Sequence, residues 1–197
     1  MINQHQEGYP IIVIYKKSIE RDYPLILIIG REPNNFQNFI GKVGDYDFDL
    51  SPRCAFWNMA YKIIGKEVNL SAKDLKKLSR EKSSSIICFS DCLPKPIPNK
   101  EKSKDTIRRE IKEEDIVNHI TNIFNKDILK RVNLIIISGV DKKPFEKSVS
   151  LIKEECYKLN ILLIEIPFLA PNNSSKINID KNSSLLIKEN FRIFGEV

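Results

Sequence analysis

Residues 24–35 have the sequence PLILIIGREPNN, in which a short apolar run stops at a glycine and a polar turn. The run lacks clean alternation and is rich in isoleucine, which is typical of a strand buried on both faces of a parallel sheet. Three further runs of this kind occur at residues 85–89, 134–137 and 161–166. With residues 25–29 of the first stretch, they predict a central four-stranded sheet.

A helical pattern follows the first run, at residues 51–65. Ser51 can cap the free amides, Pro52 suits the first helical position and Gly65 suits a left-handed C-terminal cap. One face of this predicted helix is apolar at helical spacing and should pack on the sheet. Its members are Ala55, Phe56, Met59, Ala60, Ile63 and Ile64.

Three more helices are indicated further along the chain. Ser71 and Asp74 resemble a capping box that opens a short, lysine-rich helix. An amphipathic pattern of period 3.6 places on one face Ile116, Val117, Ile120, Ile123 and Phe124. Pro144 is expected to begin another helix, because proline suits the first helical turn. That helix would turn inward Phe145, Val149, Ile152 and Cys156.

Strands therefore alternate with helices, which predicts a mainly parallel sheet with right-handed crossovers in a three-layer α/β/α arrangement. We expect a single domain over residues 1–197. The charged, proline-punctuated residues 95–115 are interpreted as a mobile loop, and residues 11–15 as an edge strand or part of a hairpin before the sheet. Ligands of such sheets bind beyond the carboxyl ends of the strands, so the chemistry is expected in those loops.

Composition is that of an ordinary globular protein, with 42% hydrophobic and 29% charged residues. The net charge of +6 is compatible with a polyanionic partner, but a lysine-rich solvated surface explains it as well. The sequence begins without a signal-peptide pattern, and no apolar run approaches the roughly 20 residues of a membrane helix. We expect a cytoplasmic monomer with no membrane partner.

Cysteine and histidine usage argues against a metal centre. Cys88 and Cys92 do not have zinc-ligand spacing and are expected to be buried thiols. His5 and His119 are the only histidines, which disfavours histidine catalysis. Neither a G-x-G-x-x-G pattern nor a P-loop is present. We predict no cofactor and no metal ion.

Glu32 is the most informative side chain of the opening stretch. A glycine turn and a restricted proline hold it just beyond the end of the first central strand. A carboxylate in this position can orient water for attack on a polarised carbon. The alternative is an exposed glutamate in an ordinary turn.

The motifs resemble the uracil-DNA glycosylase superfamily, nearest its mismatch-specific (thymine/uracil mismatch) branch. Gly30-Arg31-Glu32-Pro33-Asn34 fits the motif that ends the family's first central strand, with Glu32 in the place of the water-orienting Asp or Asn. Phe56-Trp57-Asn58 is similar to the Asn-Arg-Phe-Trp helix of that branch. The sequence PNNSS at residues 171–175 fits its Pro-Asn-x-Ser loop, beyond the fourth strand.

Two departures from the family pattern bear on activity. Ser90, with Asp91 beside it, stands where the uracil-reading Asn is usual, and a carboxylate accepts a hydrogen bond from the N4 amino group of cytosine. This favours cytosine-derived or modified bases over uracil, unless Asp91 only caps a turn before Pro94. The last loop also lacks the family's His, which leaves Asn172, main-chain amides or Lys176 to stabilise the departing base.

The resemblance implies a monofunctional DNA glycosylase that hydrolyses the N-glycosidic bond of a flipped-out uracil, mismatched or modified base in double-stranded DNA. Glu32 would position water, and Asn172 would contact the base or water. Stacking on the base is assigned to Phe56, Tyr46 or Phe48. The residues expected to hold a flanking phosphate are Ser174, Ser175 and Lys176.

Two alternatives remain open at the level of sequence. The missing His and Asn favour a non-catalytic DNA-binding module that recognises damaged or modified bases. A doubly wound enzyme that acts on free nucleosides or nucleotides is the third possibility. For a glycosylase, both DNA repair and defence against modified foreign DNA, such as that of phages, are compatible with the motifs.

Overall fold

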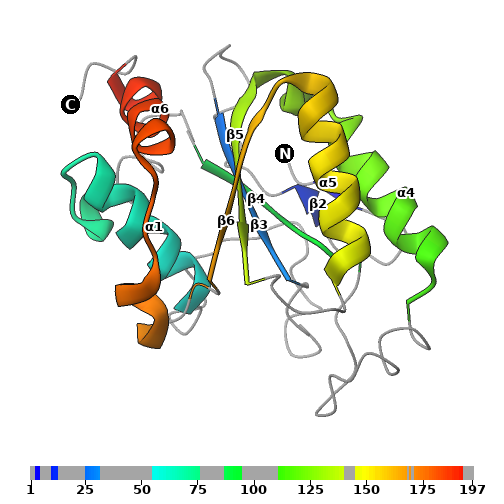
Figure 1. The fold of residues 1–197 in the computed structure, drawn as a ribbon, viewed down its shortest axis with the longest axis horizontal. Helices are drawn as coiled ribbons and strands as arrows, with labels where there is room; N and C mark the ends of the chain where they lie inside the picture. The colour runs from blue at the N-terminus through cyan, green and yellow to red at the C-terminus, as the bar shows by residue number, and fades with distance from the viewer. Residues whose placement is uncertain are drawn as a thin grey trace.

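The computed structural model describes residues 3–4, 10–12, 25–31, 55–75, 87–94, 111–139, 145–167, 169 and 171–192. Its centre is a four-stranded parallel sheet of order β4-β3-β5-β6 (Figure 1). The strands are β3 (Leu25–Gly30), β4 (Ile87–Asp91), β5 (Val132–Ser138) and β6 (Leu162–Ile166). The predicted α/β fold with a parallel four-stranded sheet is confirmed.

The sheet is the middle of three layers. Helices α4 (Glu113–Phe124) and α5 (Glu146–Leu159) cover one face, and α1 (Ala55–Glu67) and α6 (Lys181–Arg192) cover the other (Figure 1). Alternate side chains of β3 enter two separate apolar clusters, because successive residues of a strand point to opposite faces. Leu27 belongs to the cluster under α4 and α5, whereas Ile28 belongs to the cluster under α1 and α6.

Two strand predictions need correction. The described part of the second strand, Ile87–Asp91, extends past the predicted end at Phe89, so Ser90 and Asp91 are strand residues paired in register with Ile29 and Gly30. Residues 85 and 86 of the prediction lie outside the described residues. Strand β6 is not buried on both faces: Leu162 is 37% exposed, and Glu165 is exposed. In the described sheet β6 is an edge strand with β5 as its neighbour, which leaves its side chains less covered than those of the inner strands.

The C-terminal end of α1 also differs from its prediction. Gly65 is a buried residue within the helix, and the left-handed position belongs to Asn69, with φ of 57°. Leu70 N–H donates to Gly65 O at 2.8 Å and Asn69 N–H donates to Lys66 O at 3.4 Å, which together form a Schellman cap. Asparagine tolerates this backbone region better than most residues, so it can take the glycine's role.

The predicted apolar helix faces are confirmed where the structure describes them. Met59, Ala60 and Ile64 of α1 are buried, and Ile63 is partly buried. The buried face of α4 includes Ile116, Ile120, Ile123 and Phe124, with Val117 half-buried. On α5 the inward residues are Val149, Ile152 and Cys156, preceded by buried Phe145. Ser51, Pro52 and Pro144 lie outside the described residues.

Several boundaries were not visible in the pattern. The charged stretch predicted as a loop over residues 95–115 contains buried Ile111 and the first turn of α4. Helix α6 was not predicted, because two of its four buried residues, Ser183 and Asn190, are polar. Asp180 marks its start, accepting hydrogen bonds at Oδ1 from the backbone amides of Asn182 and Ser183 at 3.0 Å.

The remaining described elements are short. Ser71 Oγ accepts the backbone N–H of Asp74 at 3.0 Å, which confirms the predicted cap of the helical turn at residues 72–75. Strand β2 (Pro10–Ile12) pairs antiparallel with β1 (Asn3–Gln4) and is separate from the central sheet, so the hairpin alternative agrees better than an edge strand. No helix in the described part of the chain is long and apolar enough to cross a membrane.

Candidate functional site

The carboxyl ends of the four parallel strands meet at one edge of the sheet, which we call the carboxyl edge. Gly30 at the end of β3 lies in register with Asp91 at the end of β4, and Cys92 N–H donates to Gly30 O at 2.9 Å. On the other side, Ser138 of β5 pairs with Ile166 of β6. The segments that follow these strands therefore begin side by side.

Arg31 crosses the carboxyl edge from β3 to the end of β5. Its Nε donates to Gly139 O at 2.5 Å, and its guanidinium carbon lies 6.0 Å from the centre of the Phe145 ring. Gly139 has φ of 72°, a backbone conformation that glycine adopts without a side-chain penalty. Its N–H donates to Ile166 O at 2.9 Å, so one residue links the ends of β3, β5 and β6.

Ser138 fixes the start of the segment that follows β6. Its Oγ accepts the N–H of Leu169 at 3.0 Å and lies 3.4 Å from Pro167 O. The segment then forms the 3-10 helix η4 (Pro171–Lys176), which contains the PNNSS motif and lies against α1. Three hydrogen bonds thus connect the ends of the strands: Cys92 with Gly30, Arg31 with Gly139, and Ser138 with Leu169. Together with the chain links between neighbours, they extend across the carboxyl edge to the residues that precede η4.

The predicted site residues are only partly described. Asp91 is half-buried at the carboxyl edge, whereas Ser90 is 4% exposed, within the sheet. Phe56 lies in the first turn of α1, and Asn172 and Ser174 lie in η4. Ser175 and Lys176 are exposed. The sequence-predicted residues outside the described part are Glu32, Pro33, Asn34, Tyr46 and Phe48.

Two contacts at the end of β4 were missed from the sequence. The Nε2 atom of buried His119, on α4, is hydrogen-bonded to Asp91 O at 2.8 Å. Ser148 of α5 donates from Oγ to Cys92 O at 2.8 Å. Both contacts go to backbone carbonyls and fix the course of the chain next to Asp91. His119 follows Ile116 by three positions and precedes Ile123 by four, so helical spacing places it on the apolar face of α4.

Cys88, within β4, and Cys92, just after it, are buried, as predicted. Burial raises the pKa of the Cys88 thiol to about 12 and raises that of Cys92 well above its ordinary range. Both groups are therefore neutral thiols at physiological pH, and neither has the thiolate character of a nucleophile. Among the described residues, no group of three or more His, Cys, Asp or Glu side chains is arranged to hold a metal ion.

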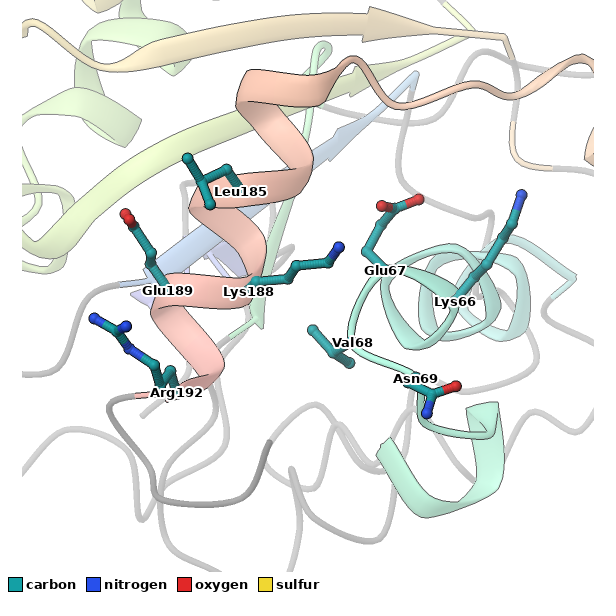
Figure 2. A pocket seen from close by; sticks show the side chains of 8 residues that line it. All are labelled: Lys66, Glu67, Val68, Asn69, Leu185, Lys188, Glu189 and Arg192. Atoms are coloured by element: carbon teal, nitrogen blue, oxygen red, sulfur yellow. The ribbon is translucent and has the colours of Figure 1, made fainter.

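A groove of about 380 Å³ lies elsewhere, between the C-terminal ends of α1 and α6 (Figure 2). The start of β5 is beside α6, because Asn133 and Asn190 form a reciprocal pair of side-chain hydrogen bonds. The groove is therefore at the end of the sheet opposite to the carboxyl edge. Its lining mixes both charge signs, with Lys66, Lys188 and Arg192 beside Glu67 and Glu189. It contains none of the predicted site residues.

Comparison with known proteins identifies no relative: no family model matches the sequence, and no curated protein or solved structure gives a significant match.

Proposed function

We propose that the chain is a monofunctional DNA glycosylase of the uracil-DNA glycosylase type, which releases an extruded base and leaves an abasic site. The observation that supports this most is the meeting of two motif segments at one edge of the sheet. Gly30, which precedes Glu32, is connected to the entrance of η4 by the hydrogen bonds of Arg31, Gly139 and Ser138. Asp91 lies beside Gly30 in the register.

The reaction takes place at the sugar carbon of a nucleotide that has left the base stack, because that carbon cannot be reached in the duplex. When the N-glycosidic bond breaks, its electron pair leaves with the base. Water adds to the sugar carbon, and its proton passes to Glu32. The base then takes up a proton, which returns Glu32 to its ionised form in the balanced reaction. Asn172 would contact the base or the water.

Selection of the base is assigned to Asp91 in preference to Ser90. The Ser90 side chain is inside the sheet, whereas that of Asp91 is half-buried at the edge. A carboxylate accepts a hydrogen bond from the N4 amino group of cytosine. The O4 of uracil is itself an acceptor and would be repelled by the carboxylate. A cytosine-derived or modified base fits this position better than uracil does.

Lys176 and Ser175 supply the contact to the DNA backbone. Both are exposed on η4, so a phosphate can approach them without rearrangement of the core. Phosphate contacts of this kind position the duplex and do not read its sequence.

The first test is Glu32→Gln, which keeps the shape of the side chain and removes its charge. Duplexes containing uracil, mismatched thymine or modified cytosines are incubated with the protein, and abasic sites are revealed by alkaline cleavage. We expect base release to fall by about 100-fold or more, as is usual for loss of a general base, while DNA binding is kept.

Glu114→Gln is the matched control, since Glu114 is an exposed carboxylate on α4 and the charge change is the same. It should release base at the wild-type rate. Undiminished release by Glu32→Gln would contradict the role of Glu32. If the wild-type protein binds these duplexes and forms no abasic site, the chain is a binding module for altered bases and not a glycosylase.

A further inference from the structure

Arg31 is a cation fixed at the carboxyl edge, one residue before Glu32. We propose that Arg31 binds an anionic oxygen of the substrate, an inference that rests on the proposed function. The side chain is half-buried and is held by the hydrogen bond from Nε to Gly139 O and by the Phe145 ring. These contacts place the positive charge between the end of β3 and the end of β5.

The geometry favours an anion over other ligands. The Nε contact sets the plane of the guanidinium, and a planar guanidinium binds two anionic oxygens by parallel N–H bonds. Partial burial strengthens the attraction, because charges interact more strongly where water is partly excluded. Lys176 is a weaker candidate for this task, since it is an exposed and flexible point charge on η4.

Two substrate groups have the required chemistry. One is the oxygen of the departing base, which becomes negative as it receives the electron pair of the broken bond. The other is a phosphate next to the extruded nucleotide. The sequence of residues 168–176, FLAPNNSSK, has no histidine to stabilise the base. Gly139 connects Arg31 to the strand that leads into this segment, so Arg31 lies on the correct side of the sheet to supply that charge.

The test compares Arg31→Gln with Arg192→Gln, which removes the same charge from an exposed position on α6. The probes are duplexes with uracil or 5-fluorouracil opposite guanine, and a duplex with a tetrahydrofuran abasic-site analogue. We expect Arg31→Gln to lower single-turnover release of uracil by about 100-fold, the usual cost of one oxyanion donor. Arg192→Gln should release it at the wild-type rate.

The two sources of negative charge give different results. 5-Fluorouracil is the better leaving group, because fluorine makes its N1–H more acidic. If Arg31 stabilises the base, Arg31→Gln loses less on 5-fluorouracil than on uracil. If Arg31 binds a phosphate, the loss is equal for both bases, and affinity for the tetrahydrofuran duplex falls with a salt-dependence slope lower by about one. Equal rates and affinities for Arg31→Gln and Arg192→Gln overturn the proposal.

Arg31→Lys separates charge from structural support, because lysine keeps the charge but lacks the planar fork. Partial recovery of rate or affinity relative to Arg31→Gln, at equal thermal stability, supports anion binding. Equal losses in both variants, each accompanied by a matching fall in thermal stability, indicate a purely structural role and overturn it. If the wild-type protein releases neither of these bases, and also releases no mismatched thymine or modified cytosine, the proposed glycosylase function fails. The proposed anion binding by Arg31 is then tested by affinity for the tetrahydrofuran duplex alone. That affinity must still fall more in Arg31→Gln than in Arg192→Gln.

Discussion

Gly65 has a role that its residue type alone does not reveal. A Cβ at this position would lie 2.5 Å from the carbonyl oxygen of Leu70, which belongs to the cap of α1. Alanine inside a helix usually adds about 1 kcal/mol of stability over glycine. At position 65 we expect the reverse, because the Leu70 backbone must move away and lose its hydrogen bond to Gly65 O.

Gly65→Ala should therefore lower the free energy of unfolding by about 1–3 kcal/mol, the usual cost of overpacking, measured by urea denaturation. Asn69→Gly is the companion change, since it places glycine at the left-handed position of the same cap. It should leave stability unchanged or raise it slightly. A more stable Gly65→Ala protein would contradict this account of the cap.

At the scale of elements, α6 is connected to the sheet by a pair of amide side chains. Asn133 Nδ2 donates to Asn190 Oδ1 at 2.7 Å, and Asn190 Nδ2 donates to Asn133 Oδ1 at 2.8 Å. Asn190 is 1% exposed and Asn133 is half-buried, so removal of either side chain leaves the other amide with restricted access to water. We expect Asn133→Ala and Asn190→Ala each to cost about 1–3 kcal/mol.

The double variant should cost clearly less than the sum of the two single changes, since the pair acts as one unit. A double-mutant cycle by urea denaturation measures this coupling. Strict additivity would show that the two amides contribute independently.

Elements could be predicted where one physical signal dominates. The apolar runs indicated the four strands, and helical spacing indicated the inward faces of α1, α4 and α5. Ends were harder. Ser90 and Asp91 are polar, yet their pairing with Ile29 and Gly30 carries them into the sheet. Helix α6 was missed, since its buried face combines apolar Ile187 and Phe191 with polar Ser183 and Asn190, and the partner of Asn190 is distant in the sequence.

The candidate site, too, could be predicted from the sequence only in part. The rule that ligands bind beyond the carboxyl ends of parallel strands placed Gly30, Asp91 and residues 171–176 at one edge. The contacts of Arg31 with Gly139 and of His119 with Asp91 join residues 108 and 28 positions apart. No local pattern encodes such pairs, so Arg31 was given no role of its own within the strand-end motif, and His119 was given no place at the edge from sequence alone.

For the whole molecule, the shared sheet couples the two core clusters. Each cluster depends on the same strands. Loss of one helix layer exposes one face of β3 and β5, and the strands that support the other layer are then weakened. We expect one cooperative unfolding transition, with coincident midpoints by far-ultraviolet circular dichroism and by fluorescence of Trp57 in α1.

Matched core truncations sharpen this test. Ile152→Ala removes a fully buried side chain from α5, and Ile187→Ala removes one from α6. Each should cost about 2–5 kcal/mol and shift both signals equally. Separate midpoints, or a truncation that shifts only one signal, would show that the two faces unfold independently.

The central place of β3 also has a consequence for biosynthesis. Its partners β4 and β5 come later in the chain, so the apolar segment Leu25–Gly30 leaves the ribosome long before either neighbour exists. At a synthesis rate of about 5–20 residues per second, β5 follows β3 after roughly 5–20 s. During that time an unpaired, isoleucine-rich strand is available to chaperones and to other nascent chains. Production of this protein therefore depends on what shields its first central strand during translation.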